Sequence, residues 1–206
     1  MKRRALLLAP AATALSMLAA CAQRRVHAEE EPESLVDAAV AQLLAQPSEH
    51  PFSAVVDFSR RSSEPRFHVL ERSSGQIVQR FVVAHGSGSA APGDDGYAEV
   101  FSNVEGSEAS SLGLYRTGDT YVSEQLENGL SMRLHGLSPS NSNAYKRLIV
   151  VHGHWSMDPR NIRERGSAGL SEGCLVFSYK DRDVVVDMLK GGALIFAVKD
   201  LARLQV

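Results

Sequence analysis

From residue 52 onward, the chain alternates between short strand-forming segments and turn-forming segments. The segments 52–58, 66–71 and 77–84 are rich in β-branched and aromatic residues, and RSSEP and RSSGQ separate them as turns. Further segments of this kind follow at 111–118, 121–125, 131–137, 147–153 and 193–198. We therefore predict a mostly β fold with a few helices.

Two segments have helical spacing instead. Residues 34–47 carry apolar pairs at 35/36, 39/40 and 43/44, with Ser34 placed to open a helix and Pro47 to close it. Near the C-terminus, Ser178 with Asp181 resembles a capping box, and Gly191 is placed to end the helix. The apolar face expected for this helix is Val184, Val185, Met188 and Leu189.

The first 21 residues have the layout of an export signal. MKRR supplies positive charge, an apolar run follows, and LAAC at 18–21 resembles the lipobox of bacterial lipoproteins. We expect residues 1–20 to be a lipoprotein signal peptide and Cys21 to carry the lipid. The alternative is cleavage near the same alanines without a lipid. Ala22 favours an outer-membrane anchor over inner-membrane retention, hence a periplasmic protein, and both Sec and twin-arginine export remain open.

Residues 21–50 then form a polar tether and the short helix, and residues 51–206 form the folded domain. The net charge of −2 is unlike that of a nucleic-acid-binding protein, so no nucleic-acid partner is expected. Removal of residues 1–20 takes away three basic residues and no acidic ones, which leaves −5. No apolar run of 18 residues exists beyond the N-terminus, so no internal membrane span is predicted.

Cys174 is the only cysteine after Cys21. An unpaired thiol is unusual in compartments that favour disulfides, and a Cys21–Cys174 disulfide is the structural alternative. Cys174 follows Ser-Glu-Gly, and a His-Gly pair lies upstream. A thiol acts as a nucleophile when a nearby histidine takes its proton, and backbone N–H groups around the preceding glycine can face an oxyanion. These parts fit cysteine acyl transfer, whereas the other interpretation is an inert buried cysteine.

Metal binding is a rival use of the same side chains. His135, His152, His154 and Cys174 are zinc ligands by type. However, the chain has no CxxC, HxxxH or HExxH motif, and we expect His152 and His154 to point to opposite sides. We therefore predict no metal and no other cofactor.

These residues carry a resemblance to a known family. VVHG at 150–153, the loop after it and SEGC at 171–174 resemble the YkuD-like L,D-transpeptidase catalytic domain, in a divergent murein L,D-transpeptidase branch, over about residues 52–200. The resemblance implies that Cys174 is the nucleophile, that His152 is its base and that the Gly153 carbonyl orients the histidine ring. It also implies an L,D-transpeptidase-like catalytic domain with a β-sandwich or barrel-like core over 51–206, and peptidoglycan stem peptides as substrates.

The chain departs from the common family pattern, in which Ser-His-Gly-Cys is followed by an arginine two residues later. Glu172 replaces the histidine, Val176 stands at the arginine position, and His152 lies 22 residues before Cys174, further than usual. Because that arginine helps to hold the substrate, the sequence supports the nucleophile more strongly than the substrate. Arg163 and Arg165 are the candidates for a replacement cation.

Four further residues are site candidates. Gly173 is the candidate for the oxyanion, Ser171 for fixing the loop or donating to the site, and His135 and His154 for substrate contact, with structural roles as the alternatives. The predicted function is an exported cysteine acyltransferase that crosslinks or remodels peptidoglycan and reaches the membrane through its lipid anchor. The alternatives are an L,D-carboxypeptidase or endopeptidase that uses water as acceptor, and a non-catalytic peptidoglycan-binding lipoprotein.

Overall fold

The structure, a computed structural model, describes residues 34–125 and 127–203. The predicted signal peptide, Cys21 and residues 22–33 of the tether lie outside the described residues. The α-helices of the described part are α1 (Leu35–Leu44), α2 (Pro159–Arg165) and α3 (Tyr179–Leu189). Its strands are β1 (Phe52–Asp57), β2 (Phe67–Glu71), β3 (Ile77–Phe81), β4 (His85–Gly86), β5 (Gly113–Val122), β6 (Leu130–Gly136), β7 (Val150–Gly153), β8 (Leu170–Ser171), β9 (Leu175–Phe177) and β10 (Leu194–Val198).

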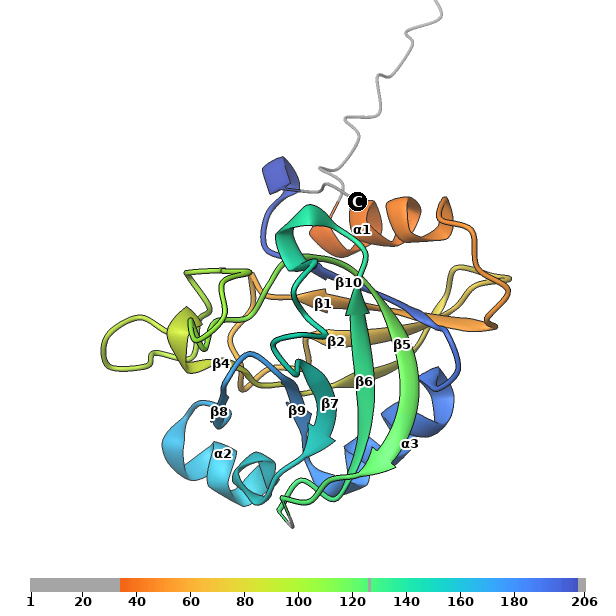
Figure 1. The fold of residues 1–206 in the computed structure, drawn as a ribbon. Helices are drawn as coiled ribbons and strands as arrows, with labels where there is room; N and C mark the ends of the chain where they lie inside the picture. The colour runs from red at the N-terminus through yellow and green to blue at the C-terminus, as the bar shows by residue number, and fades with distance from the viewer. Residues whose placement is uncertain (1–33, 126, 204–206) are drawn as a thin grey trace, which may run out of the picture. The chain divides into compact units, whose positions relative to one another are not determined.

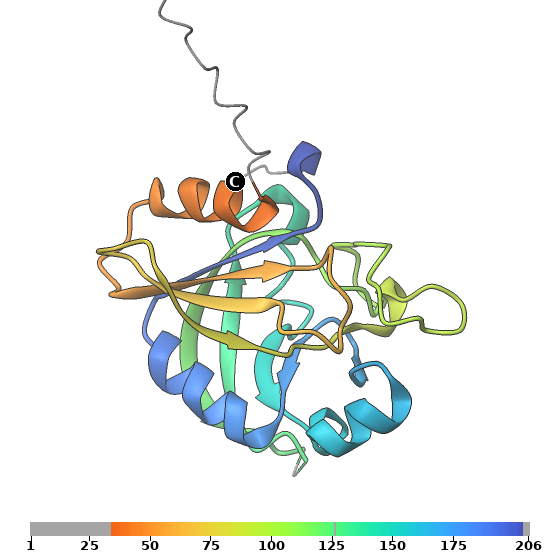
Figure 2. The same cartoon turned by 180° about the vertical axis from the view of Figure 1, so that it is seen from behind.

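Eight of these strands form one sheet in the order β3-β2-β1-β10-β5-β6-β7-β9, and β4 pairs with β8 in a small second sheet. The large sheet curls until its edges meet through their side chains. The ring of Phe81 in β3 lies 6.4 Å from that of Phe177 in β9, and Phe67 in β2 stands edge-on to Phe177 at 5.0 Å. Figures 1 and 2 show the resulting barrel-like, nearly closed layer. The prediction of a mostly β, barrel-like fold is confirmed.

The strands divide their side chains between two apolar clusters, as the alternation of a pleated strand requires. One set points into the barrel and forms the main core, which includes Val56, Met132 and Val151. On the outer face of β1 and β10, residues such as Val55 pack against α1. The predicted start of α1 is confirmed, because the Ser34 hydroxyl accepts a hydrogen bond from the Asp37 N–H at 3.1 Å.

Helix α3 begins where the capping pattern predicts, with the Ser178 hydroxyl accepting from the Asp181 N–H at 3.1 Å. Its predicted apolar face is partly wrong. Val185 and Leu189 are buried in the main core, but Val184 is 38% exposed and Val186 is buried in its place. Residues 182, 185, 186 and 189 follow the i, i+3, i+4, i+7 spacing of one helical face, and residue 184 lies beside this stripe.

Two further predictions, one of a strand and one of a loop, are also wrong. The segment 121–125 is no separate strand, because β5 runs without a break to Val122 and a turn follows. The segment after β7 was predicted to be a polar loop, but it contains a 3₁₀ turn at Trp155–Met157 and then α2. Asp158 caps α2 and Gly166 ends it at φ 76°. In the described part of the chain, no helix has the length and apolarity needed to cross a bilayer.

Candidate active site

Strand register places Cys174 and His152 on one face of the sheet. Strands β7 and β9 are parallel, with His152 opposite Val176 and Val151 opposite Leu175. Val151 and Leu175 point into the barrel core, so their neighbours in sequence point outward. Cys174 precedes β9 and packs beside Val176 in a small outer cluster. The two side chains are therefore separated by one strand spacing, ~4.8 Å, and two residues along the strands, ~6.6 Å.

The loop that carries Cys174 is fixed by its own polar groups. The Ser171 hydroxyl donates to the Cys174 carbonyl at 2.9 Å and accepts from the Gly173 N–H at 3.1 Å. We considered two roles for Ser171, and its contacts are those of a residue that fixes the loop. It also shows that the Gly173 N–H is already engaged, so this N–H is not free for an oxyanion in this arrangement.

Gly173 is required by the backbone at this position. Its φ is 109°, and a Cβ there would lie 2.7 Å from the Ala109 carbonyl oxygen and 2.8 Å from Cδ1 of Ile149. A side chain would therefore be strained by conformation and by contact. The glycine allows the cysteine loop to pass directly against the segment that ends at Ser111.

The Cys174 thiol is half-buried and protonated at neutral pH. Its Sγ contacts the Leu148 carbonyl oxygen at 3.6 Å. Burial raises the pKa of the thiol from 9.0 to about 11; the negative charge of Glu172 adds to the rise, and Arg147 opposes it. The thiol side chain packs against an outer cluster formed by Ala84, Met157, Ile162, Ala168 and Val176. The resting group is thus a thiol and not a thiolate.

His152 is held in one orientation. Its side chain is largely buried, with 9% of the residue exposed, and Nδ1 lies 3.0 Å from the Gly153 carbonyl oxygen. A carbonyl can only accept, so Nδ1 carries the proton and Nε2 has the lone pair in the neutral ring. Burial is the main cause that lowers the pKa of His152 below its ordinary value. A neutral imidazole with a fixed tautomer can accept a proton from a thiol through Nε2.

His154 faces other partners. Its Nδ1 lies 2.7 Å from the Ser156 hydroxyl, its Nε2 lies 3.1 Å from a carboxylate oxygen of Glu127, and its ring is 5.3 Å from that of Trp155. Trp155 is 54% exposed. His154 therefore has other partners than His152 and lies beside an exposed aromatic ring. The expectation that strand geometry sends the two side chains to opposite sides is wrong in its reason, because residues i and i+2 of a strand share a face. Strand β7 ends at Gly153, and His154 is already the N-cap of the 3₁₀ turn at Trp155–Met157.

His135 lies on the same outer face as His152, toward the beginning of β7. Ser131 is opposite His152 and Arg133 is opposite Val150. His135, two residues after Arg133, lies on the same face beyond the end of the paired segment. Its ring stacks on Tyr145 at 5.0 Å and 12°. No hydrogen bond joins it to the cysteine or to His152 among the described residues. Its proposed substrate contact stays a prediction.

Sequence reasoning missed the arginines around the cysteine. The guanidinium of Arg147 donates to four oxygen acceptors on the segment facing the loop: Ser102 O and Ser111 Oγ at 2.7 Å, Ser107 Oγ at 3.2 Å and Ala109 O at 2.6 Å. A Cβ on Gly173 would lie 3.3 Å from its Nη2. Arg147, Glu108 and Glu172 line a hollow of about 180 Å³ beside the cysteine loop. No spacing rule connects Arg147 to a loop 26 residues later, so the sequence held no signal for it.

A second missed arginine belongs to an exposed aromatic group. Arg133 in β6 lies over the ring of Tyr121 at 4.4 Å and over that of Tyr145 at 5.7 Å. Since Arg133 is opposite Val150, it lies on the same face as His152. The arginines predicted from the sequence lie elsewhere: Arg163 and Arg165 are in α2, and Nη2 of Arg165 donates to the Ser156 carbonyl.

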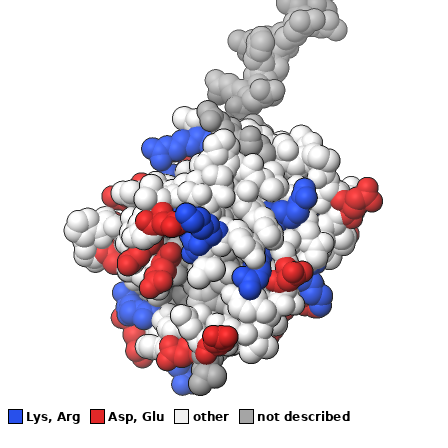
Figure 3. Space-filling model, in the orientation of Figure 1, with Lys and Arg blue, Asp and Glu red and all other residues white. Residues whose placement is uncertain are grey.

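Charge on the face drawn in Figure 3 is mixed, with acidic and basic side chains interspersed. Within the described residues, no three His, Cys, Asp or Glu side chains are grouped so that they could hold a metal ion. The expectation of a metal-free site stays a prediction.

A curled sheet that presents a cysteine loop beside a carbonyl-oriented histidine defines a candidate cysteine active site on a barrel-like domain. Residues 29–198 match the L,D-transpeptidase catalytic domain family. Because this match spans most of the sequence, the chain belongs to that family.

Several solved structures are similar to the chain at low identity. An L,D-transpeptidase from Mycobacterium smegmatis is 13% identical, with a TM-score of 0.43 over 72% of this chain and 58% of that one. An L,D-transpeptidase from Stackebrandtia nassauensis is 15% identical, with a TM-score of 0.43 over 81% and 68%. The helical cell shape determining protein Pgp2 from Campylobacter jejuni is 12% identical, with a TM-score of 0.43 over 79% and 53%. The match thus spans little more than half of the first of these proteins. No curated protein matches the chain.

Proposed function

We propose that this protein is an exported cysteine acyltransferase that acts on peptidoglycan stem peptides. Membership in the L,D-transpeptidase catalytic domain family supports the substrate class. The observation that carries the mechanism is the 3.0 Å contact between His152 Nδ1 and the Gly153 carbonyl, on the strand beside Cys174. This contact leaves Nε2 as the basic nitrogen on the face that the cysteine shares.

The proposed reaction begins with two neutral groups. As the substrate amide approaches, the Cys174 proton moves to Nε2 of His152 and sulfur attacks the carbonyl carbon. The resulting oxyanion accepts a hydrogen bond from the Cys174 N–H, since the Gly173 N–H is bonded to Ser171. The C–N bond then breaks, and the imidazolium returns the proton to the leaving amine. An acceptor amine then attacks the thioester. This attack forms the amide bond of the crosslink and releases the thiol of Cys174.

Of the two arginines described above, one is available to hold an acidic group of a stem peptide. Arg147 lies behind the cysteine loop, where most of its N–H groups are engaged, and we assign it a positioning role for Gly173. Arg133 is on the open face, held over two tyrosine rings, and we assign it the carboxylate contact. A cation held over aromatic rings is oriented without losing its hydrogen-bond donors.

The buried thiol favours a second candidate function. A pKa of about 11 leaves very little thiolate in the resting protein, which is what a non-catalytic peptidoglycan-binding lipoprotein would tolerate. A third outcome, hydrolysis by an L,D-carboxypeptidase or endopeptidase, differs from crosslinking only in the acceptor. These functions share the fold and are separated by their products.

The test is incubation of the purified protein with muropeptides and, separately, with a carbapenem, followed by mass spectrometry. We expect an adduct on Cys174 in the wild type and none in Cys174→Ser, which is close to isosteric. Crosslinked muropeptides identify transpeptidation, and trimmed ones identify hydrolysis. If muropeptides bind but neither adduct nor product forms, the binding lipoprotein is correct and the enzyme is not.

Export and lipidation are proposed from the N-terminal sequence alone. We infer a periplasmic protein anchored to the outer membrane through lipid on Cys21. Fatty-acid labelling in a bacterial host should be present in the wild type and in Cys174→Ser and absent in Cys21→Ala. Labelling that persists in Cys21→Ala would show that the lipobox interpretation is wrong.

A further inference from the structure

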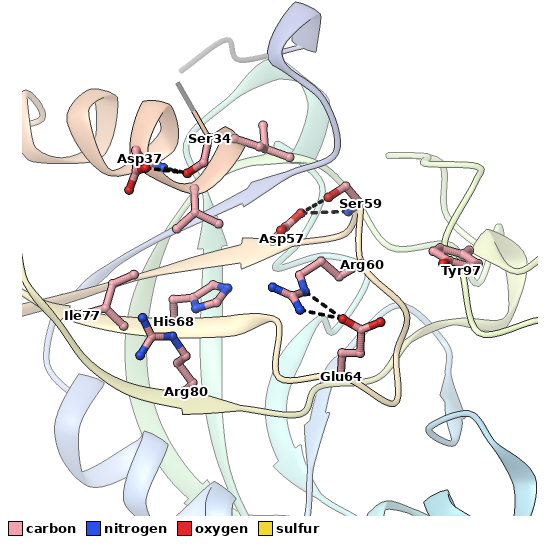
Figure 4. A pocket seen from close by; sticks show the side chains of 12 residues that line it. Ser34, Asp37, Asp57, Ser59, Arg60, Glu64, His68, Ile77, Arg80 and Tyr97 are labelled. Atoms are coloured by element: carbon pink, nitrogen blue, oxygen red, sulfur yellow. Dashed lines mark hydrogen bonds and ion pairs between the residues drawn. The ribbon is translucent and has the colours of Figure 1, made fainter. Parts of the chain in front are cut away.

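One hollow of the described structure has no lining residue in the cysteine loop. It measures about 590 Å³ and is lined by the beginning of α1, the end of β1, the turn that follows β1, and the outer faces of β2 and β3 (Figure 4). None of the residues that line it belongs to β7 or β9. The volume falls in the range of small-molecule sites, roughly 300–1,000 Å³.

His68 in β2 lines this hollow with unsatisfied polar atoms. The residue is 3% exposed, yet neither Nδ1 nor Nε2 has a hydrogen-bond partner. A neutral imidazole offers one donor and one acceptor, and the great majority of buried polar side-chain atoms in folded proteins are paired. His68 lies opposite Val55 in β1 and opposite Arg80 in β3, which fixes its ring on the outer face. The two unpaired ring nitrogens of His68 therefore indicate that a polar partner is missing.

The charged groups around His68 have both signs. Asp57 accepts hydrogen bonds from the Ser59 N–H and hydroxyl, both on Oδ1, which leaves Oδ2 for another donor. Arg60 is paired with Glu64 at 2.6 Å, but Arg80 makes no ion pair or hydrogen bond with any described residue. Figure 4 shows His68 between the Asp57 side and the Arg80 side of the hollow.

Helix α1 adds backbone donors. The Asp37 N–H is capped by Ser34, and the Ala38 N–H bonds to the Ser34 carbonyl at 3.0 Å. The N–H groups of Leu35 and Val36 have no acceptor within the helix, and both residues line the hollow. They lie at the positive end of the helix dipole, which favours a negative group.

We propose that this hollow is a binding site for a zwitterionic amino acid or short peptide. A simple anion would meet the carboxylate of Asp57, and a simple cation would meet Arg80. A ligand with both charges places its carboxylate on Arg80 and the amino end of α1 and its ammonium on Oδ2 of Asp57. His68 then pairs with a polar atom between the two charged ends. The site is separate from the cysteine loop and does not depend on the proposed reaction.

The experiment is an NMR titration of the full chain, with the His68 ring signals as the readout and alanyl-alanine dipeptides of D and L configuration as probes. We expect a saturable shift of His68 with at least one dipeptide. Arg80→Gln and Asp57→Asn should each weaken the affinity about tenfold, because each removes a charge-assisted contact. Asparagine keeps an oxygen for the Ser59 donors, so the second variant should stay folded.

Matched controls separate this site from others. Arg116→Gln removes an exposed arginine of β5 that is not part of the hollow and should leave the affinity unchanged. Cys174→Ser should also bind as the wild type. Acetate and methylamine, which carry one charge each, should shift His68 less than the dipeptides at equal concentration. The proposal is overturned if no dipeptide moves His68, if Arg80→Gln binds as tightly as the wild type, or if acetate binds as tightly as the dipeptides.

Discussion

The reactivity of Cys174 as a function of pH gives the sharpest prediction. Burial raises the pKa of this thiol from 9.0 to about 11. At pH 7 the thiolate fraction then falls from about 1 in 100 to about 1 in 10,000. A more basic thiolate is also a better nucleophile, by about 0.4–0.5 of a log unit for each pKa unit, which recovers roughly tenfold. Alkylation at pH 7 should therefore be about tenfold slower than that of an unfolded cysteine.

The assay is alkylation by iodoacetamide between pH 7 and pH 10, with the Cys174 peptide quantified by mass spectrometry so that Cys21 does not contribute. A synthetic SEGCLVF peptide is the matched control. The rate for the protein should rise about tenfold for each pH unit across this range without a plateau. A plateau with a midpoint below pH 8 would refute the reasoning, because it would require a thiolate stabilised by an imidazolium in the resting protein.

Four further predictions concern the base, a buried histidine, a glycine and the metal. His152→Ala should lower kcat on muropeptides by about 10²–10⁴-fold while alkylation changes little, whereas His154→Ala should mainly raise KM; the reverse pattern would make His154 the base. Burial lowers the pKa of His85 from 6.5 to about 4, so the unfolded chain binds more protons between these values and stability should fall as pH drops from 6.5 to 4, by at most about 3 kcal/mol. In His85→Asn, which keeps an acceptor for Arg66, urea unfolding should show a smaller loss over this range. Gly173→Ala should cost about 1–3 kcal/mol in the same assay and abolish the carbapenem adduct; an unchanged adduct would show that the φ of 109° is not needed. Chelator treatment should leave turnover unchanged, and recovery by zinc after a loss would overturn the cysteine mechanism.

The sequence predicted the fold where local chemistry determines it. Strands such as β1 and β2 combine β-branched residues with flanking turns, and α1 begins at a residue that caps it. The misses have local explanations too. A strand of ten residues such as β5 can contain an irregularity, here the register shift between Thr117 and Thr120, that looks like a break in the pattern. The order of strands and the closure through Phe177 depend on long-range packing, which no window of sequence contains.

The candidate site was predictable only in part. The two residues that share a motif with a known family, Cys174 and His152, are brought to one face by the parallel pairing of β7 with β9. The hydrogen bond from the Gly173 N–H to Ser171 spans two residues but depends on the conformation of the loop, and the position of Arg147 behind the loop depends on how distant segments meet. The raised pKa of the thiol was largely hidden, because its main cause is the burial of Cys174, to which the neighbouring Glu172 only adds.

Two of the three departures from the family pattern, the long spacing between His152 and Cys174 and Val176 at the arginine position, meet in one part of the structure. The segment between His152 and Cys174 contains the 3₁₀ turn and α2, and Met157 and Ile162 of these two elements pack with Val176 on the outer face of β9. Val176 is 3% exposed beneath them, so an arginine at that position would bury an unpaired charge. Because α2 covers this position, a cation that binds the substrate has to come from the side of His152 that α2 leaves open. On that side, β6 carries Arg133. The substrate carboxylate of the proposed reaction is therefore expected on the β6 side of the histidine, and Arg133→Gln should raise KM for muropeptides with little change in kcat. An unchanged KM would show that this side of the sheet does not hold the substrate.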